Sequence, residues 1–104
     1  MYLVVFRNRK RDDMDDAAYA ADADRMVELA SAQSGFLSFK SYVAEDGEVV
    51  AISEWEDDAA ALGWRRVAEH AEVQSRGRAH YYASYTLFAC DAPKVHHFTM
   101  EDGK

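Results

Sequence analysis

Residues that can hold or move a proton are few in this sequence, and His70 is the first candidate. It follows Trp64 by six residues in a helical pattern, which places the imidazole about 120° around the helix from the indole, at the edge of the apolar stripe. A histidine at the rim of a pocket can accept or relay a proton near neutral pH. The alternative is a half-exposed histidine bonded to Arg66 or Glu69. His70 is therefore a candidate catalytic residue with a structural alternative.

Other side chains are candidates for holding a ligand. The ring of Trp64 can stack on a flat ligand while its indole N–H donates to an oxygen, or it can simply fill the core. Asn8, at the end of an apolar run, can polarise a substrate oxygen, or it can be a turn residue. The third group consists of tyrosines that divide between core, interface and ligand: Tyr81, Tyr82 and Tyr85.

Length and charge restrict the class of protein. A chain of 104 residues can form one modest core, so we expect a single domain over residues 1–104. The formal net charge is −7, and acidic residues directly follow the one basic cluster at residues 7–11. Nucleic-acid surfaces need clustered Lys and Arg. The sequence therefore predicts no nucleic-acid partner.

Cysteine and histidine usage argues against a metal or another cofactor. The only cysteine, Cys90, cannot form an internal disulfide, and we expect it to be a buried strand residue in a protein of the reducing cytoplasm. His96 and His97 are adjacent, and no HExxH, GxGxxG or P-loop pattern accompanies them. No apolar run is long enough for a signal peptide or a membrane span.

The predicted elements follow the order β-α-β-β-α-β. Apolar and aromatic runs bounded by turn signals predict strands, and acidic residues that precede an i, i+3, i+4 apolar pattern predict helices, the first capped by Asp12 or Asp13. Gly35 ends the first helix, and the second is expected to end near Gly77. The expected strands are residues 2–8, 36–44, 48–55 and 81–90. This order is the α+β, ferredoxin-like layout, an antiparallel sheet with helices on one side.

The last long strand predicts a homodimer. Its alternate positions carry large side chains in both directions, with Tyr81, Tyr85 and Leu87 facing one way and Tyr82 and Phe88 the other. Helices cover only one face, so a second subunit is the economical cover for the other. The alternative is a monomer with a hydrophobic ligand groove. Residues 93–104, after the strand is broken at Pro93, are expected to be a tail or an arm that the two subunits exchange.

Dispersed motifs make the whole chain similar to one family. They are residues 52–57 (ISEWED), Ala60, Trp64-Arg65, Glu69-His70, Gly77-Arg78, Tyr81-Tyr82 and Tyr85. Together they resemble the antibiotic biosynthesis monooxygenase domain. The resemblance implies a dimeric α+β barrel in which each subunit holds a cavity between its sheet and its helices.

The resemblance also implies a function. Some family members oxygenate polycyclic phenols without metal or flavin, which here implies that Trp64 and the tyrosines hold the phenol and that His70 lies near the proton to be removed. Other members open haem with an Asn, a Trp and a His, for which Asn8, Trp64 and His70 are the nearest candidates. In those members the histidine lies further beyond the tryptophan than the six residues found here. A non-catalytic or stress-related ligand-binding dimer is the remaining alternative.

Overall fold

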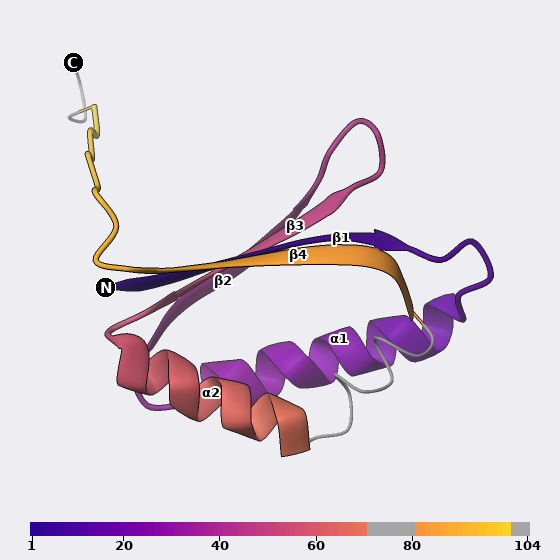
Figure 1. Ribbon diagram of the computed structural model, residues 1–104, viewed down its shortest axis with the longest axis horizontal. Coiled ribbons are helices and arrows are strands. Elements are labelled where there is room, and N and C mark those ends of the chain that lie inside the picture. Colours follow the sequence, from indigo (N-terminus) through magenta and orange to yellow (C-terminus); the bar gives the residue numbers. More distant parts are fainter. Residues whose placement is uncertain (71–80, 101–104) are drawn as a thin grey trace.

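The computed structural model describes residues 1–70 and 81–100, apart from the side chains of residues 68–70. Six elements follow one another: β1 (Tyr2–Lys10), α1 (Asp16–Ser31), β2 (Phe36–Val43), β3 (Val49–Trp55), α2 (Asp58–His70) and β4 (Tyr82–Asp91). The strands form one antiparallel sheet in the order β2-β3-β1-β4. Both helices lie on the same side of this sheet (Figure 1). The predicted α+β, ferredoxin-like fold is therefore confirmed.

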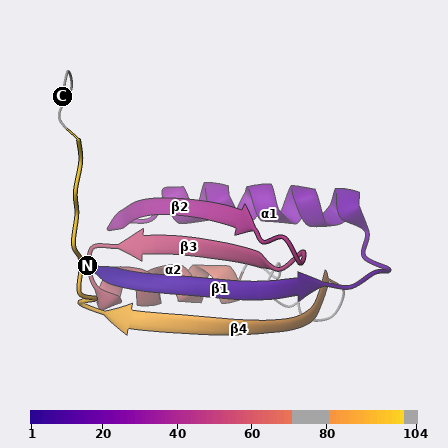
Figure 2. The same ribbon diagram turned by 90° about the horizontal axis from the view of Figure 1, so that it is seen from above.

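The two central strands of the sheet are β3 and β1. β1 lies between β3 and β4, and β2 forms the opposite edge from β4 (Figure 2). The chain reaches this order because each β-α-β unit returns to the sheet one strand away, which leaves room for the other unit's strand. β1 therefore contributes side chains to the middle of both faces.

The core lies where the helices cover one end of the sheet. Trp55, at the end of β3, is completely buried, and its indole N–H donates to the Ser53 hydroxyl at 3.0 Å. The Trp55 ring meets Phe36 edge-on at 5.5 Å and is stacked on Trp64 of α2 at 6.0 Å. Burial of aromatic rings of this size is a large stabilising contribution. Trp64 thus anchors α2 to the sheet.

The expected element boundaries hold with small differences. Asp15 caps α1, because its carboxylate accepts from the Ala18 backbone N–H at 3.0 Å. The prediction of Asp12 or Asp13 as the cap was wrong, since the helix begins one turn later than the acidic run suggests. Asp57 caps α2, because its carboxylate accepts from the Ala60 backbone N–H at 2.8 Å. Gly77, where that helix was expected to end, lies outside the described residues.

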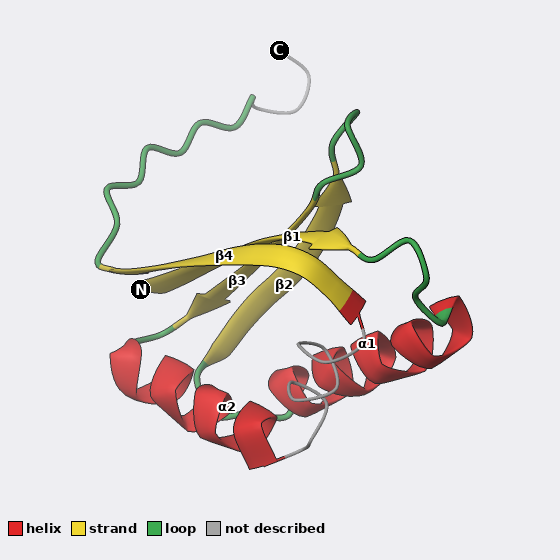
Figure 3. Cartoon of the chain, turned by 45° about the vertical axis from the view of Figure 1, so that its right-hand side comes forward, coloured by secondary structure: helices red, strands yellow, loops and turns green. Residues whose placement is uncertain are grey.

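Residues after β4 have no regular secondary structure in the described part of the chain. Residues 92–100 run away from the body in an extended path, on the side of the sheet opposite the helices (Figures 1 and 3). Ala92 begins this departure with a positive φ of 50°. The last described segment is therefore an arm, rather than a fifth strand added to this chain's own sheet.

Candidate active site

One group of polar side chains faces the helices at the far end of β1. Alternate residues of a strand point to opposite faces, and Tyr2 and Val4 pack into the core beneath the helices. Phe6, Asn8 and Lys10 follow on that same face. Asn8 is only 3% exposed, so it is a buried strand residue and not the turn residue that the sequence left open.

Aromatic side chains surround this end of β1. Phe6 lies 5.4 Å from Tyr82 and 5.3 Å from Tyr85, measured between ring centroids, and the two tyrosine rings are 5.9 Å apart. The Lys10 amine lies 4.7 Å from the centre of the Tyr19 ring of α1 and 5.1 Å from that of Tyr82. We call these six residues, Phe6, Asn8, Lys10, Tyr19, Tyr82 and Tyr85, the Asn8–Lys10 site.

An irregularity in β4 builds the site. Arg9 pairs with Ser84, but Lys10 pairs with Tyr82, so Ala83 is an extra residue in the ladder. A bulge of this kind moves the following side chains to the other face. Tyr82 therefore joins Tyr85 on the helix side, and the predicted alternation, which placed them on opposite faces, was wrong. The bulge was invisible in the sequence because no Gly marks it.

Lys10 has an unusual electrostatic environment for a lysine. Its amine donates a hydrogen bond to the Asn8 side-chain oxygen, and within residues 1–70 and 81–100 it makes no ion pair with a carboxylate. Burial penalises the charged form, and it lowers the pKa of Lys10 to about 8. The two π faces partly stabilise the ammonium. Lys10 therefore changes its charge within the pH range in which proteins work.

The buried tyrosines of the site stay protonated. Burial, and then the neighbouring Tyr19, Tyr81 and Tyr85, raise the pKa of Tyr82 well above its ordinary value. Burial likewise raises the pKa of Tyr19. Both are hydrogen-bond donors at neutral pH. Tyr85 leaves 45% of its surface exposed, so it presents an aromatic face toward solvent at the edge of the sheet.

Tyr81 lies beside the site and is held by α1. It is 5% exposed, its hydroxyl donates to the Asp22 carboxylate at 2.6 Å, and its ring meets Tyr19 edge-on at 5.4 Å. These contacts fix the start of β4 against the helix. Of the three tyrosines predicted to hold a ligand, Tyr82 and Tyr85 belong to the Asn8–Lys10 site. Tyr81 lies next to the site and packs against Tyr19 of α1.

Trp64 lies elsewhere in the fold. Its ring stacks on Trp55, which pairs with Tyr2, six residues along β1 from Asn8. At ~3.3 Å per residue, that spacing is roughly 20 Å of strand. The structure therefore places Trp64 in the core and does not bring it together with Asn8. His70 is the last residue of α2, and its side chain lies outside the described residues.

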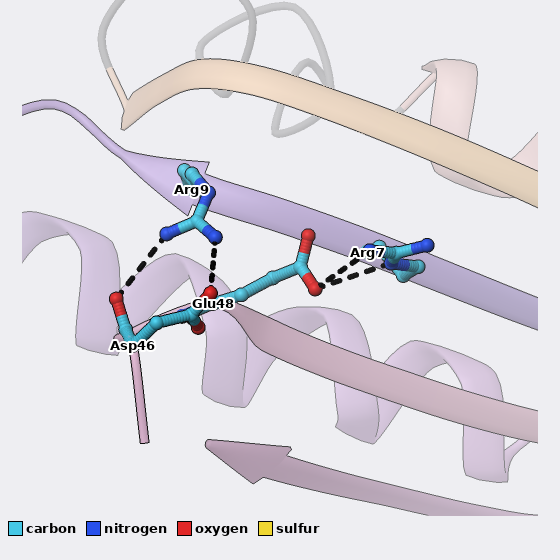
Figure 4. Close-up of polar contacts among 4 residues, drawn as sticks. All are labelled: Arg7, Arg9, Asp46 and Glu48. Carbon is cyan, nitrogen blue, oxygen red and sulfur yellow. Dashed lines mark hydrogen bonds and ion pairs between the residues drawn. The ribbon is translucent and has the colours of Figure 1, made fainter. Parts of the chain in front are cut away.

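Lys10 was not among the candidate residues predicted from the sequence, although the sequence contains a signal for it. Residues 7–10 alternate along β1, and the outward arginines pair with carboxylates of the loop that joins β2 to β3. Arg7 donates to Glu48 at 3.0 Å and Arg9 to Asp46 at 2.6 Å (Figure 4). Lys10 is the member of this basic run that points inward. Side chains alternate between the two faces of a strand, for charged residues as well as for apolar ones. This alternation would have placed Lys10 on the opposite face from Arg7 and Arg9.

An open hollow of about 450 Å³ borders this end of β1, lined by Arg9, Lys10, Arg11, Asp12, Asp46, Gly47 and Ala83. No group of His, Cys, Asp or Glu side chains that could hold a metal ion occurs in the described part of the chain. No helix among the described residues is long and apolar enough to cross a membrane.

The described features define a ferredoxin-like α+β protein with a polar, aromatic-walled site between sheet and helices. The family model for antibiotic biosynthesis monooxygenases matches residues 1–76, and the chain belongs to this family.

Three comparisons place the chain among its relatives. It is 36% identical over 86 residues to the uncharacterized protein YqjZ of Bacillus subtilis (strain 168), covering 83% of this chain and 74% of that one. The fold is similar to that of Rv0793 from Mycobacterium tuberculosis, with a TM-score of 0.77, 21% identity and coverage of 91% and 96% of the two chains. It is also similar to SnoaB, a cofactor-independent oxygenase from Streptomyces nogalater, with a TM-score of 0.73, 17% identity and coverage of 90% and 94%.

Proposed function

We propose that this protein is a cofactor-independent monooxygenase that acts on a small aromatic or polycyclic phenol bound at the Asn8–Lys10 site. The observation that supports this proposal most directly is the buried amide of Asn8, which has an unpaired donor among the described residues. Asn8 is 3% exposed, its side-chain oxygen is occupied by Lys10, and its amide N–H group has no partner among the described residues. A buried donor without a partner costs free energy. A substrate oxygen would satisfy it.

The surroundings of Asn8 suit a flat substrate. Phe6, Tyr82 and Tyr85 present aromatic surfaces within stacking distance of one another, and aromatic rings favour offset or edge-on contact with such a substrate. Family membership and the fold shared with a cofactor-independent oxygenase support the same class of reaction.

The proposed reaction starts with loss of the phenolic proton. The resulting phenolate has carbanion character at a ring carbon. It transfers an electron to O2, and recombination of the two radicals forms a carbon–oxygen bond at that carbon. For an anthrone, the CH2 group becomes a carbonyl and the second oxygen atom leaves as water. The Asn8 amide would donate to the substrate oxygen on which negative charge develops, a contribution worth roughly 10²-fold or more in rate. His70 stays in the proposal as a candidate proton relay, and Trp64 as a residue that positions α2.

Oxygen uptake by metal-stripped protein with a panel of anthrones and hydroquinones tests this function. We expect uptake by the parent and a fall of roughly 10²-fold in kcat/KM for Asn8→Ala. Asn8→Asp is the second variant: it keeps an oxygen acceptor for Lys10 and removes the N–H donors, and it also adds a negative charge beside the amine. Full activity in Asn8→Asp would contradict the donor role.

The same assay separates the alternatives. Thermal stabilisation by the panel without oxygen uptake would indicate a ligand-binding dimer, and a Soret band on adding haemin would indicate haem chemistry. His70→Ala and Trp64→Ala belong in the series. We expect Trp64→Ala to lower thermal stability together with activity, because its ring packs on the buried Trp55. A fall in activity at unchanged stability in His70→Ala would support the proton relay.

We also propose that the protein is a homodimer joined through the sheet face that its helices leave open. This outer face carries Leu3, Val5, Tyr42, Val50, Ile52, Phe88 and Cys90, as the strand register requires. Phe88 is 51% and Tyr42 54% exposed in the single chain, and Cys90 is exposed instead of buried as predicted. The same face also carries the charged residues Arg7, Lys40 and Glu54. Large exposed apolar side chains grouped on one sheet face are typical of an interface.

The arm supports the same assembly. It leaves the sheet on the side of the outer face (Figure 1), and its apolar side chains are among the most exposed in the chain: Val95 at 68%, Phe98 at 81% and Met100 at 66%. Apolar side chains this exposed gain by contacting another subunit. We propose that the arm contacts the partner subunit.

A further inference from the structure

We infer that Lys10 is the proton acceptor of this site, taking the proton of a phenolic hydroxyl and then holding the phenolate as an ammonium. The inference rests on the proposed function, because it concerns the same substrate class and the same site. It goes beyond that function by naming a base that the sequence analysis did not consider. The position of the Lys10 amine, its hydrogen bond to Asn8 and the absence of a counter-charge among the described residues support it.

The first support is position. The amine lies between the rings of Tyr19 and Tyr82, 4.7 and 5.1 Å from their centres, and it holds the Asn8 side-chain oxygen. The planar Asn8 amide carries two N–H bonds, and the one syn to the carbonyl oxygen points to the same side as that oxygen, where the Lys10 amine lies. A substrate oxygen bound by that N–H group therefore lies in the same aromatic enclosure as the amine.

The second support is the charge around Lys10. Three carboxylates of neighbouring elements are engaged elsewhere: Asp46 and Glu48 pair with Arg9 and Arg7 on the other face, and Asp22 accepts from the Tyr81 hydroxyl. Asp12 borders the same surface hollow as Lys10 but makes no ion pair with it. No ion pair of Lys10 occurs in the described part of the chain. An ammonium here would have π faces and an amide oxygen as its partners, and an anionic ligand would be its counter-ion.

The ionisation behaviour of the surrounding groups agrees with this. Among the described residues, the titratable groups that face the amine are phenols, Tyr19 on α1 and Tyr82 on β4, with Tyr85 and Tyr81 beside them. Burial raises the pKa of Tyr19 and of Tyr82, so neither competes for the role of base at neutral pH. Burial lowers the pKa of Lys10 to about 8, which leaves an appreciable fraction as free amine.

The proposed step is a single proton transfer. The substrate O–H bond breaks, a new N–H bond forms on the Lys10 amine, and the electron pair of the broken bond stays on the phenolate oxygen. No atom is oxidised or reduced in this step. The product is an ion pair beside the half-buried rings of Tyr19 and Tyr82, where fewer water molecules than in bulk solvent compete with the ammonium for the phenolate.

A phenol that cannot be oxygenated separates this inference from the activity itself. The probe is 1,8-dihydroxyanthraquinone, which has no oxidisable CH2 group and changes its visible spectrum when it ionises. We expect the bound probe to ionise about 1 to 3 pH units lower than the free probe in the parent protein, because a cation forms beside it. In Lys10→Met the bound probe should ionise no more readily than in solution. Lys40→Met, on the opposite sheet face, should behave as the parent.

Lys10→Arg distinguishes a proton acceptor from a fixed positive charge. Arginine is always protonated, so this variant should stabilise the bound anion but release about one proton to the buffer per probe bound. The parent, titrated at a pH between the pKa of Lys10 and that of the free probe, should release close to none. The number of protons follows from binding enthalpies measured in buffers of different ionisation enthalpy.

Several outcomes would overturn the inference. They are failure of the parent to bind the probe, the same ionisation shift in Lys10→Met, and release of a full proton by the parent. An ionisation shift that depends on Lys10, found in a protein that consumes no oxygen, would support the inference while rejecting the monooxygenase. Oxygen uptake that is unchanged in Lys10→Met would support the monooxygenase while rejecting Lys10 as its proton acceptor. Thermal unfolding of each variant establishes that it is folded.

Discussion

Arg9 and Lys10 are consecutive residues of β1 that point to opposite faces of the sheet, and their pKa values shift in opposite directions. Arg9 faces outward, and its hydrogen bond and charge contact with Asp46 raise its pKa. The pKa of Asp46 is lowered, first by the Glu48 backbone N–H and then by Arg9. Both groups are fully exposed, so this pairing contributes little to stability. Lys10, one residue further, faces inward with no carboxylate partner among the described residues, and burial lowers its pKa.

The lowered pKa of Lys10 predicts how stability depends on pH. Between about pH 8 and the ordinary lysine value of 10.5, the folded state binds fewer protons than the unfolded chain. The free energy of unfolding should therefore rise with pH across this window. The raised pKa values of Tyr19 and Tyr82 oppose this above about pH 10, where the unfolded tyrosines ionise. Urea unfolding of the parent and Lys10→Met from pH 7 to 10 checks this.

Lys10→Met should remove the rise, since methionine does not titrate. Competitive acylation with mass spectrometry gives a direct second measurement. The Lys10 amine should become reactive near pH 8, about two units before free N-acetyl-lysine amide, which has the ordinary pKa of about 10.4. Reactivity that follows the free reference compound would show that burial does not lower the pKa.

The turn between α1 and β2 depends on one glycine. Gly35 has a φ of +83°, and a Cβ at this position would lie 2.5 Å from the Cβ of Ala60 in α2. Its carbonyl accepts from the Glu56 backbone N–H at 2.8 Å. The end of α1, the start of β2 and the start of α2 therefore meet at a point with no room for a side chain. This junction sets the position of α2 over Trp55.

Gly35→Ala should lower the free energy of unfolding by about 1 to 3 kcal/mol from backbone strain, with a further loss from the contact with Ala60. Gly47→Ala is the matched control. Gly47 also has a left-handed φ, +89°, but a Cβ added there would have nothing within 4 Å. Denaturant unfolding compares the two. Equal losses would mean that α2 moves to accommodate the methyl group and that the junction is not tightly packed.

A single chain leaves one whole sheet face uncovered. The helices shield the side that holds Asn8 and Trp55, while the outer face and the arm lie on the other (Figures 1 and 3). The outer face lacks a helix because both crossovers return on the same side of the sheet. Association of two outer faces would bury Phe88 and Cys90 without disturbing the Asn8–Lys10 site.

Phe88→Asp should shift the protein from dimer to monomer by at least 10-fold in the dissociation constant, because it puts a charge into the proposed interface. Val27→Asp is the matched control: Val27 is 39% exposed, but it lies on α1, away from the outer face. Sedimentation velocity over a concentration series measures both. A parent that is monomeric at all concentrations would contradict the dimer.

Truncation after Ala92 tests the arm separately. If residues 93–104 contact the partner, the shortened chain should dissociate at higher concentration than the full chain. The helix-side site should be unaffected, since no described contact joins it to the arm. A dimer of unchanged affinity would limit the interface to the sheet face.

Local sequence determined the order of elements, the short connection between the strands at residues 36–44 and 48–55, and the family motifs. It also proposed Asn8, Tyr82 and Tyr85 as site candidates. These features could be predicted because the spacing of apolar residues and the turn residues can be recognised within short stretches of sequence.

Only the tertiary structure decided how the candidates combine. The extra residue at Ala83 turned Tyr82 toward Tyr85, Trp64 went to Trp55 in the core, and Lys10 entered the enclosure formed with Tyr19. Each of these outcomes depends on strand register or on packing between elements far apart in the chain. A shift of one residue reverses the face on which a side chain lies, and nothing in the residues next to it records that shift.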